Sequence, residues 1–183
     1  SSRGLNGFVI GHIGRFSEQK NHLFLLKVFN AIYQKKNDIF LVLVGSGLLF
    51  DAVMSYAKKL ECFNNIIFEG EVKNINDILS GFDLIVLPSL FEGFPVVSVE
   101  AQFNGLPVLM SSEITKECKL NSNVNFIDLD ENKWIDAILK NCVNNEKRCE
   151  PSENMYEYDI KSCYKELSNI YKTIYLNSKS KIK

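Results

Sequence analysis

The sequence predicts a doubly wound α/β domain, in which helices cover both faces of a parallel sheet. Two observations support this fold class. Strand-like runs alternate along the chain with segments of helical periodicity, and the runs at residues 39–44 and 84–87 are continuously apolar, as expected of strands buried on both faces. Hydrophobic residues make up 46% of the 183 residues, enough for one sizeable core. Ligands of such sheets bind beyond the carboxyl ends of the strands.

The first half of the chain shows three strand–helix pairs. The expected strands are residues 8–13, 39–44 and 65–68, and the expected helices are residues 21–36, 48–60 and 75–79. Asn21 is the expected N-cap of the first helix. His12 lies within the first strand, and we expect a core histidine there, with exposure to the ligand crevice as the alternative. His22, near the start of a helix, is expected at the surface.

The second half continues the alternation. The expected strands are residues 84–87, 108–110 and 124–127, and the expected helices are residues 95–104, 131–143 and 156–177. Pro95 suits the first helical position, where a missing N–H has no cost. Asp128 and Asp130 have the D-x-D spacing of some metal-dependent transferases, but Asp130 is better explained as an N-cap. One domain is thus predicted over residues 8–177, after a linker remnant at 1–7 and before a polar tail at 178–183.

Composition and charge exclude several classes of protein. A formal net charge of −1 argues against a nucleic-acid footprint. The five cysteines are odd in number and include no C-x-x-C pair, so neither disulfides nor a zinc site are expected. We interpret them as reduced, mostly buried thiols of a cytoplasmic protein. The longest apolar stretch, residues 40–44, is far too short to span a bilayer.

The first polar cluster, residues 14–20, directly follows the first expected strand. Arg15 offers a planar fork and Lys20 a mobile point charge, so the two cations could clamp one diphosphate. The helix that begins nearby adds its anion-attracting N-terminus. A polar loop with two solvated cations is the alternative, and the pattern alone does not decide between them.

The second cluster, Gly45-Ser46-Gly47, follows the second expected strand. It begins like the dinucleotide fingerprint G-x-G-x-x-G, but Phe50 occupies the third glycine position, which disfavours NAD. Glycines here would let backbone approach a ligand, although a tight turn is the simpler interpretation.

The third cluster follows the fourth expected strand and opens a helix. Glu92 precedes the helix and Glu100 lies within it, so the two carboxylates could reach different hydroxyl groups of one long ligand. Gly93 permits close backbone approach, and the N–H groups of Phe94 and Val96 begin a helix, where they could bind oxygen atoms. A capping Glu92 and a solvated Glu100 are the alternative. That alternative suits Glu100 poorly, because its neighbours are nearly all apolar.

Taken together, these clusters resemble the C-terminal, donor-binding domain of family 4 retaining glycosyltransferases, or glycosyl transferases group 1, which have the two-domain GT-B fold. The resemblance rests on residues 14–21, 43–49, 68–72, 83–109 and 158–160. Its most specific element is the pair Glu92 and Glu100 with Gly93 and Pro95 between them. The resemblance implies that the predicted domain is Rossmann-like and forms one half of a GT-B enzyme.

The resemblance also implies a role for each matching residue. Arg15 and Lys20 would bind the donor diphosphate and Glu92 the donor sugar, and these three would form the catalytic set. Glu100 would bind the ribose, and Val72 would lie near the base. The other donor-binding residues would be Gly14, Gly45, Gly47, Gly93, Phe94 and Val96. No metal or other cofactor is implied, and the substrate would be a UDP- or GDP-linked sugar.

The implied function is hexosyl transfer with retention, in the synthesis of bacterial capsule or other surface polysaccharide. The acceptor-binding N-terminal domain is expected outside this chain, so this part alone should be inactive. The full enzyme is expected in the cytoplasm, with a peripheral position at the inner face of the membrane left open. Two alternatives remain, an epimerase of similar fold that acts on nucleotide-sugars and a non-catalytic nucleotide-binding module. The sequence does not identify the base, the sugar, the acceptor or the oligomeric state.

Overall fold

A computed structural model describes residues 5–144 and 148–180 of the chain. Contacts within the chain divide it into two compact units, Ser1–Glu150 and Pro151–Lys183. The division falls inside the single domain, residues 8–177, that the sequence predicts.

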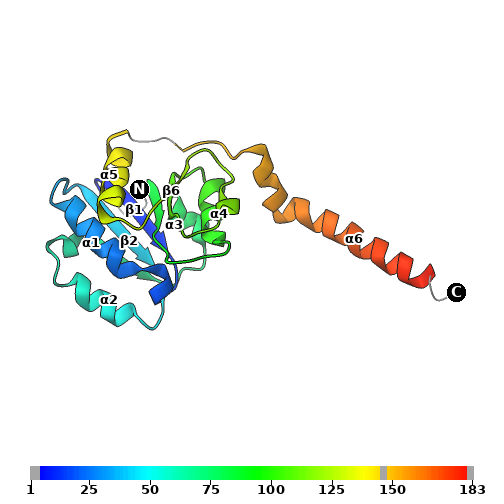
Figure 1. Ribbon diagram of the computed structural model, residues 1–183, viewed down its shortest axis with the longest axis horizontal. Coiled ribbons are helices and arrows are strands. Elements are labelled where there is room, and N and C mark those ends of the chain that lie inside the picture. The colour runs from blue at the N-terminus through cyan, green and yellow to red at the C-terminus, as the bar shows by residue number, and fades with distance from the viewer. Residues whose placement is uncertain (1–4, 145–147, 181–183) are drawn as a thin grey trace. The chain divides into compact units, whose positions relative to one another are not determined.

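The first unit is built on a six-stranded parallel sheet with the order β3-β2-β1-β4-β5-β6 (Figure 1). The strands are β1 (Phe8–Ile13), β2 (Ile39–Val44), β3 (Ile66–Gly70), β4 (Leu84–Leu87), β5 (Val108–Ser111) and β6 (Val124–Ile127). The chain moves outward from β1 to β3 and then returns to add β4 on the other side of β1. The predicted doubly wound sheet is therefore confirmed, and its strand order reverses between β1 and β4, where ligands bind in this class of fold.

Helices cover both faces of the sheet (Figure 1). They are α1 (His22–Tyr33), α2 (Phe50–Ala57), α3 (Ile75–Leu79), α4 (Val96–Phe103) and α5 (Glu131–Asn144). Residues of α1, α2 and α5 pack with Ile10 and Leu41 on one face, whereas α3 and α4 pack with Val9 and Val42 on the other. Neighbouring residues of one strand thus enter opposite cores, which explains the uninterrupted apolar runs in the sequence.

Three expectations at helix ends are corrected by the structure. Helix α1 is shorter than predicted, and Asn21 does not cap it with its side chain. Asn21 instead adopts a left-handed conformation with φ of 55°, and its amide donates to the Pro88 carbonyl at 3.2 Å. Pro95 precedes α4 rather than beginning it. The capping role of Asp130 is confirmed, because its carboxylate accepts the Lys133 N–H at 2.9 Å.

The second unit comprises a 3₁₀ turn, Glu153–Tyr158, and the long helix α6 (Ile160–Ser180). Several large apolar side chains of α6 are exposed, among them Leu167, Ile170 and Ile174. Across residues 5–144 and 148–180, no helix combines the length and the apolar character needed to cross a bilayer. The five cysteines have free thiols, and only Cys62 and Cys118 among them are buried.

Candidate functional site

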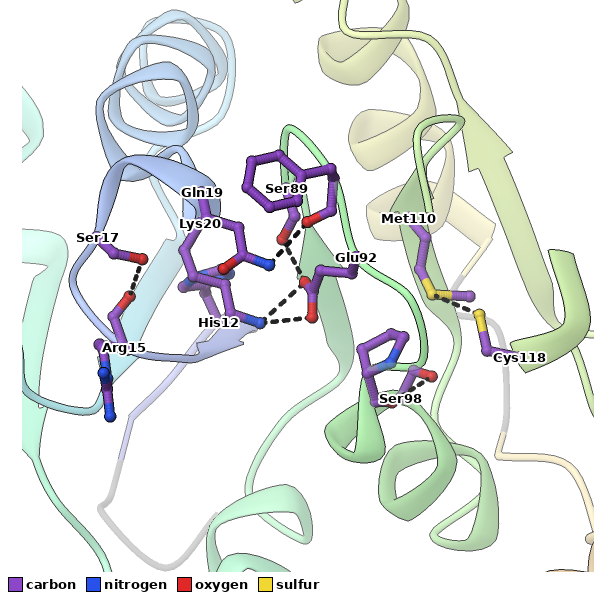
Figure 2. Close-up of polar contacts among 12 residues, drawn as sticks. His12, Arg15, Ser17, Gln19, Lys20, Ser89, Glu92, Ser98, Met110 and Cys118 are labelled. Carbon is purple, nitrogen blue, oxygen red and sulfur yellow. Dashed lines mark hydrogen bonds and ion pairs between the residues drawn. The ribbon is translucent and has the colours of Figure 1, made fainter. Parts of the chain in front are cut away.

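An ion pair joins the loops that follow the two central strands, β1 and β4. Lys20, the last residue of a 3₁₀ turn (Glu18–Lys20), places its Nζ 2.8 and 2.9 Å from the two carboxylate oxygens of Glu92 (Figure 2). The side chains are only 14% and 9% exposed, respectively. A pair so shielded from water is stronger than an ordinary surface pair. The structure thus brings together two of the three predicted catalytic residues, at the switch point of the sheet.

Hydrogen bonds fix the two loops against each other. The Leu90 N–H donates to the Gln19 carbonyl at 2.8 Å, and the Gln19 amide donates to the Phe91 carbonyl, also at 2.8 Å. The bond from Asn21 to the Pro88 carbonyl adds a third connection. These roles of Gln19 and Asn21 were not predicted from the sequence, because the contacts join residues far apart along the chain.

Glu92 has a further partner in Ser89, whose hydroxyl donates to Oε1 of the carboxylate (Figure 2). Ser89 is fully buried directly beyond β4. The backbone of Glu92 is also held, because it bridges to Ile114 and its carbonyl accepts the Thr115 N–H at 3.3 Å. The carboxylate is therefore fixed through both its backbone and its side chain. Ser89 was not predicted, and a serine close before a glutamate is too common a pattern to reveal it.

The close approach of Lys20 to the first loop depends on Gly14. A Cβ atom at position 14 would lie 2.9 Å from Cε of Lys20, so any side chain there would displace the lysine. Gly14 itself is hydrogen-bonded from its N–H to the Val44 carbonyl at 2.9 Å. Gly14 thus anchors its loop to the end of β2 through its N–H, and its lack of a side chain leaves room for Lys20.

A cleft of about 330 Å³ opens beside the pair, at the ends of β1, β2 and β3. Its lining includes the predicted residues Gly14, Arg15, Gly45 and Val72, together with Ile13, Val44, Ser46, Glu71 and Ile75. The cleft therefore brings the first two sequence clusters into one site. Arg15 is exposed, and Figure 2 shows its side chain lying apart from the Lys20–Glu92 pair. The two predicted cations thus do not form a single clamp in this conformation.

The glycines of the second cluster permit close contact between two loops. Gly45 and Gly47 have φ values of 134° and 153°, which residues with side chains rarely adopt. Cβ atoms at these positions would lie 2.2 Å from the Gly14 carbonyl oxygen and 2.5 Å from that of Phe16, respectively. The Phe16 N–H also donates to the Ser46 carbonyl at 2.8 Å. The G-x-G segment therefore shapes the cleft through its backbone.

The residues predicted to surround the sugar and the ribose lie just before α4 and within it. Gly93, Phe94 and Val96 are exposed, and a Cβ atom at Gly93 would meet nothing within 4 Å. Glu100 is partly buried, and burial raises the pKa of its carboxyl group. Among the described residues, its carboxylate has no hydrogen-bond or ion-pair partner. Glu100 is therefore available to accept a hydrogen bond from a ligand.

Gln102 fixes α4 to the chain beyond β5. Its buried amide donates to the carbonyls of Ser98 and Cys118, and its oxygen accepts the N–H groups of Leu120 and Asn121, both at 2.9 Å. All the polar atoms of this side chain are thus satisfied in the core. The sequence analysis did not predict this role, which depends on contacts between distant segments.

Two buried histidines lie behind the ion pair. The Nδ1 atom of His12 lies 2.8 Å from the Val86 carbonyl, and burial lowers its pKa to about 4. His22 stacks on Phe16 with ring centroids 4.1 Å apart, and burial, followed by the neighbouring His12 and Lys20, lowers its pKa to about 2. Both rings are thus neutral at pH 7. His12 is the core histidine that was predicted, whereas the surface position predicted for His22 is wrong, because Phe16 folds over it.

The described residues contain no cluster of three or more His, Cys, Asp or Glu side chains that could hold a metal ion. The D-x-D residue Asp128 pairs instead with Lys133, on the surface.

Comparisons with known proteins agree with this geometry. A family model described as "Glycosyl transferases group 1" matches residues 7–142. The protein named "Putative glycosyltransferase EpsF" of Bacillus subtilis (strain 168) is 33% identical over 119 residues, which cover 64% of this chain and 31% of EpsF. The chain thus spans less than a third of that relative.

Solved structures show the same fold. The C-terminal domain of a glycosyl transferase group 1 family protein, LpcC, from Francisella tularensis has a TM-score of 0.71 at 20% identity, and the match covers 87% of this chain and 90% of that one. Anabaena HepE, solved in complex with UDP and glucose, has a TM-score of 0.68 at 23% identity, with 76% of this chain and 40% of that chain covered. The predicted fold, one Rossmann-like half of a GT-B enzyme, is thereby confirmed.

Proposed function

Because this chain belongs to the glycosyl transferases group 1 family, we propose that it is the part of a glycosyltransferase that binds the nucleotide-sugar donor. The observation that carries the proposal is the shielded Lys20–Glu92 pair beside an open cleft at the switch point of the sheet. The structure of HepE with UDP and glucose supports the choice of ligand class.

In this proposal the donor lies along the carboxyl edge of the sheet. The base occupies the cleft near Val72, whose walls include the aliphatic side chains of Ile13, Val44 and Ile75, and Glu100 accepts hydrogen bonds from the ribose. The diphosphate lies between Arg15 and Lys20, and the sugar reaches Glu92 and the exposed residues Gly93, Phe94 and Val96. When the glycosidic bond to the diphosphate breaks, negative charge develops on the leaving nucleoside diphosphate, and the two cations stabilise it.

The finer features of the function are part of the same proposal. The sugar is a hexose, transferred with retention of configuration from a UDP- or GDP-linked donor and without a metal ion. The acceptor binds a further domain of the full-length enzyme, which acts at the cytoplasmic face of the membrane in surface polysaccharide synthesis. The relatives support this picture, since EpsF is named as a glycosyltransferase and this chain spans only 31% of it.

Calorimetric titration of the chain with UDP, GDP, ADP and their sugars tests the proposal. We expect one nucleotide family to bind, and Lys20→Met to weaken binding about 10- to 100-fold, the range of a charge-assisted hydrogen bond. Lys27→Met is the matched control, because the Lys27 side chain is 53% exposed and lies away from the site. Its Nζ is 4.0 Å from Oε1 of Glu131. Failure of every nucleotide to bind would contradict the proposal, and binding of NAD alone would favour a dinucleotide module.

Gly93→Ala separates binding from folding at the proposed sugar subsite. The added methyl group meets nothing within 4 Å, so the free energy of unfolding should stay the same. The same methyl group would occupy space next to the donor sugar, so affinity for the nucleotide-sugar should fall while affinity for the nucleoside diphosphate is kept. Equal affinity of the variant and the parent for the nucleotide-sugar would place the sugar elsewhere.

A further inference from the structure

The Lys20–Glu92 pair presents a difficulty for the proposed donor site, because each group already satisfies the other. Both carboxylate oxygens of Glu92 accept from the same ammonium group. A diphosphate carries more negative charge than one carboxylate, so it competes for Lys20 when it binds. Glu92 then loses its cation at the moment when it is needed to orient the sugar.

Ser89 is the partner that does not leave with Lys20. Its hydroxyl donates to Oε1 of Glu92 independently of the lysine, and its side chain is 0% exposed. Its neighbours are fixed, since Pro88 accepts from Asn21 and Leu90 donates to the Gln19 carbonyl. The hydroxyl and the carboxylate therefore lie on one short, anchored turn.

We propose that Ser89 is a positioning residue for donor binding, which holds the Glu92 carboxylate in place when Lys20 transfers to the donor diphosphate. This inference rests on the proposed function. It adds that Lys20 leaves Glu92 for the diphosphate and that hydroxyl groups of the sugar then take its place on the carboxylate. A carboxylate has about four acceptor positions, and one hydrogen bond from Ser89 leaves the others for hydroxyl groups of the sugar. The sugar thus replaces the hydrogen bonds that Lys20 gives up.

The exchange has a measurable signature. A nucleoside diphosphate without a sugar takes Lys20 away from Glu92 and offers the carboxylate nothing in return. A nucleotide-sugar restores two or more hydrogen bonds to a carboxylate that Ser89 has kept in position. The affinity gained by adding the sugar therefore depends on Ser89, whereas the affinity of the nucleoside diphosphate does not.

Calorimetry on Ser89→Ala with a nucleoside diphosphate and its nucleotide-sugar tests this. We expect the variant to bind the nucleotide-sugar about tenfold more weakly, the effect of one charge-assisted hydrogen bond, and to bind the nucleoside diphosphate within about twofold of the parent. In a Glu92→Gln background, Ser89→Ala should cause no further selective loss. Ser89→Cys, which keeps the volume and weakens the donor, provides the same comparison if the alanine variant is unstable by circular dichroism.

Two results would overturn the inference. Equal weakening of both ligands would make Ser89 a structural residue, and unchanged affinity for both would remove it from the site. Failure of the parent chain to bind either ligand would instead contradict the proposed function itself, so the two failures are distinguishable.

Discussion

The two sides of the candidate site are built by different means. The pair side, residues 18–21 and 88–92, is held by hydrogen bonds of side chains and by the ion pair between Lys20 and Glu92. The cleft side, residues 14–15, 45–47 and 70–72, is held mainly by close contacts between backbones, to which a hydrogen bond from the Ser46 hydroxyl to the Glu71 carboxylate is added. The cation of the cleft side, Arg15, is exposed and its guanidinium group has no described partner, whereas Lys20 is 14% exposed and paired.

This contrast shows that two cations of one loop can differ in how far their side chains are ordered before an anion binds. Lys20 is held in place by a partner that a ligand must displace, whereas Arg15 is solvated and must be ordered when the ligand binds. Substitution of a glycine on the cleft side should therefore mainly lower the free energy of unfolding. Substitutions on the pair side should lower both the affinity for the ligand and the free energy of unfolding.

The largest effect is expected on the cleft side, for Gly45→Ala. The added Cβ would lie 2.2 Å from the Gly14 carbonyl oxygen, and φ of 134° is already strained for alanine. We expect the free energy of unfolding to fall by about 3 kcal/mol, combining backbone strain and overpacking. Urea denaturation measures it. Gly70→Ala is the control, because φ is +66° but no atom lies within 4 Å, so the loss should be only about 1–2 kcal/mol.

On the pair side, Lys20→Met should lower the free energy of unfolding by about 1–3 kcal/mol, since it leaves a shielded carboxylate without its cation. Adding Glu92→Gln to this variant should recover part of the loss, because the uncompensated charge is gone. A double-mutant cycle by urea denaturation measures the coupling. Additive effects of the two substitutions would show that the pair contributes nothing to stability.

The sheet could be predicted from the sequence because its strands are mainly apolar runs, uninterrupted in β2 and β4, with glycine or proline close to many of their ends. The Lys20–Glu92 contact could not be derived in this way, since it joins residues 72 positions apart and depends on β1 and β4 being neighbours. The resemblance to a family supplied both residues as candidates, but not their contact.

Burial within the site was harder to predict than its composition. His22 occupies a helix start, where a polar residue normally faces water, and it is buried because Phe16, a loop residue, stacks on it. Gln102 could not be predicted for a related reason, because most of its partners lie in a distant segment of the chain. Ser89 has a partner only three residues away, but a serine close before a glutamate is too common a pattern to predict the contact. The role of Ser89 in donor binding, like the roles of the predicted site residues, stays a prediction.

A smaller effect, of the two buried histidines next to the pair side, concerns pH. His12 and His22 have pKa values lowered from 6.5 to about 4 and about 2, so below pH 6.5 the unfolded chain binds protons that the folded chain does not. Above pH 6.5 the two rings do not affect the free energy of unfolding. Below pH 6.5 they lower it progressively, by up to about 1.4 kcal/mol per pH unit for each ring, until the pH reaches the lowered pKa of that ring. His22→Phe keeps the stacking on Phe16 and should roughly halve this slope between pH 6 and pH 5, measured by urea denaturation. An unchanged slope would mean that His22 titrates normally.

The smallest effect on folding is expected for Arg15→Gln, which tests the cleft side directly. Because the Arg15 side chain is exposed and its guanidinium group has no described partner, the midpoint of urea denaturation should not move. Affinity for the nucleoside diphosphate should nevertheless fall several-fold at low salt, and the difference from the parent should shrink as ionic strength rises, since the interaction of a solvated charge is screened. Lys20→Met should keep more of its effect at high salt, because the pair is shielded from water. Equal salt dependence of the two variants would mean that Arg15 and Lys20 are equally shielded when the diphosphate is bound, so that the contrast between the two sides would belong to the free protein alone.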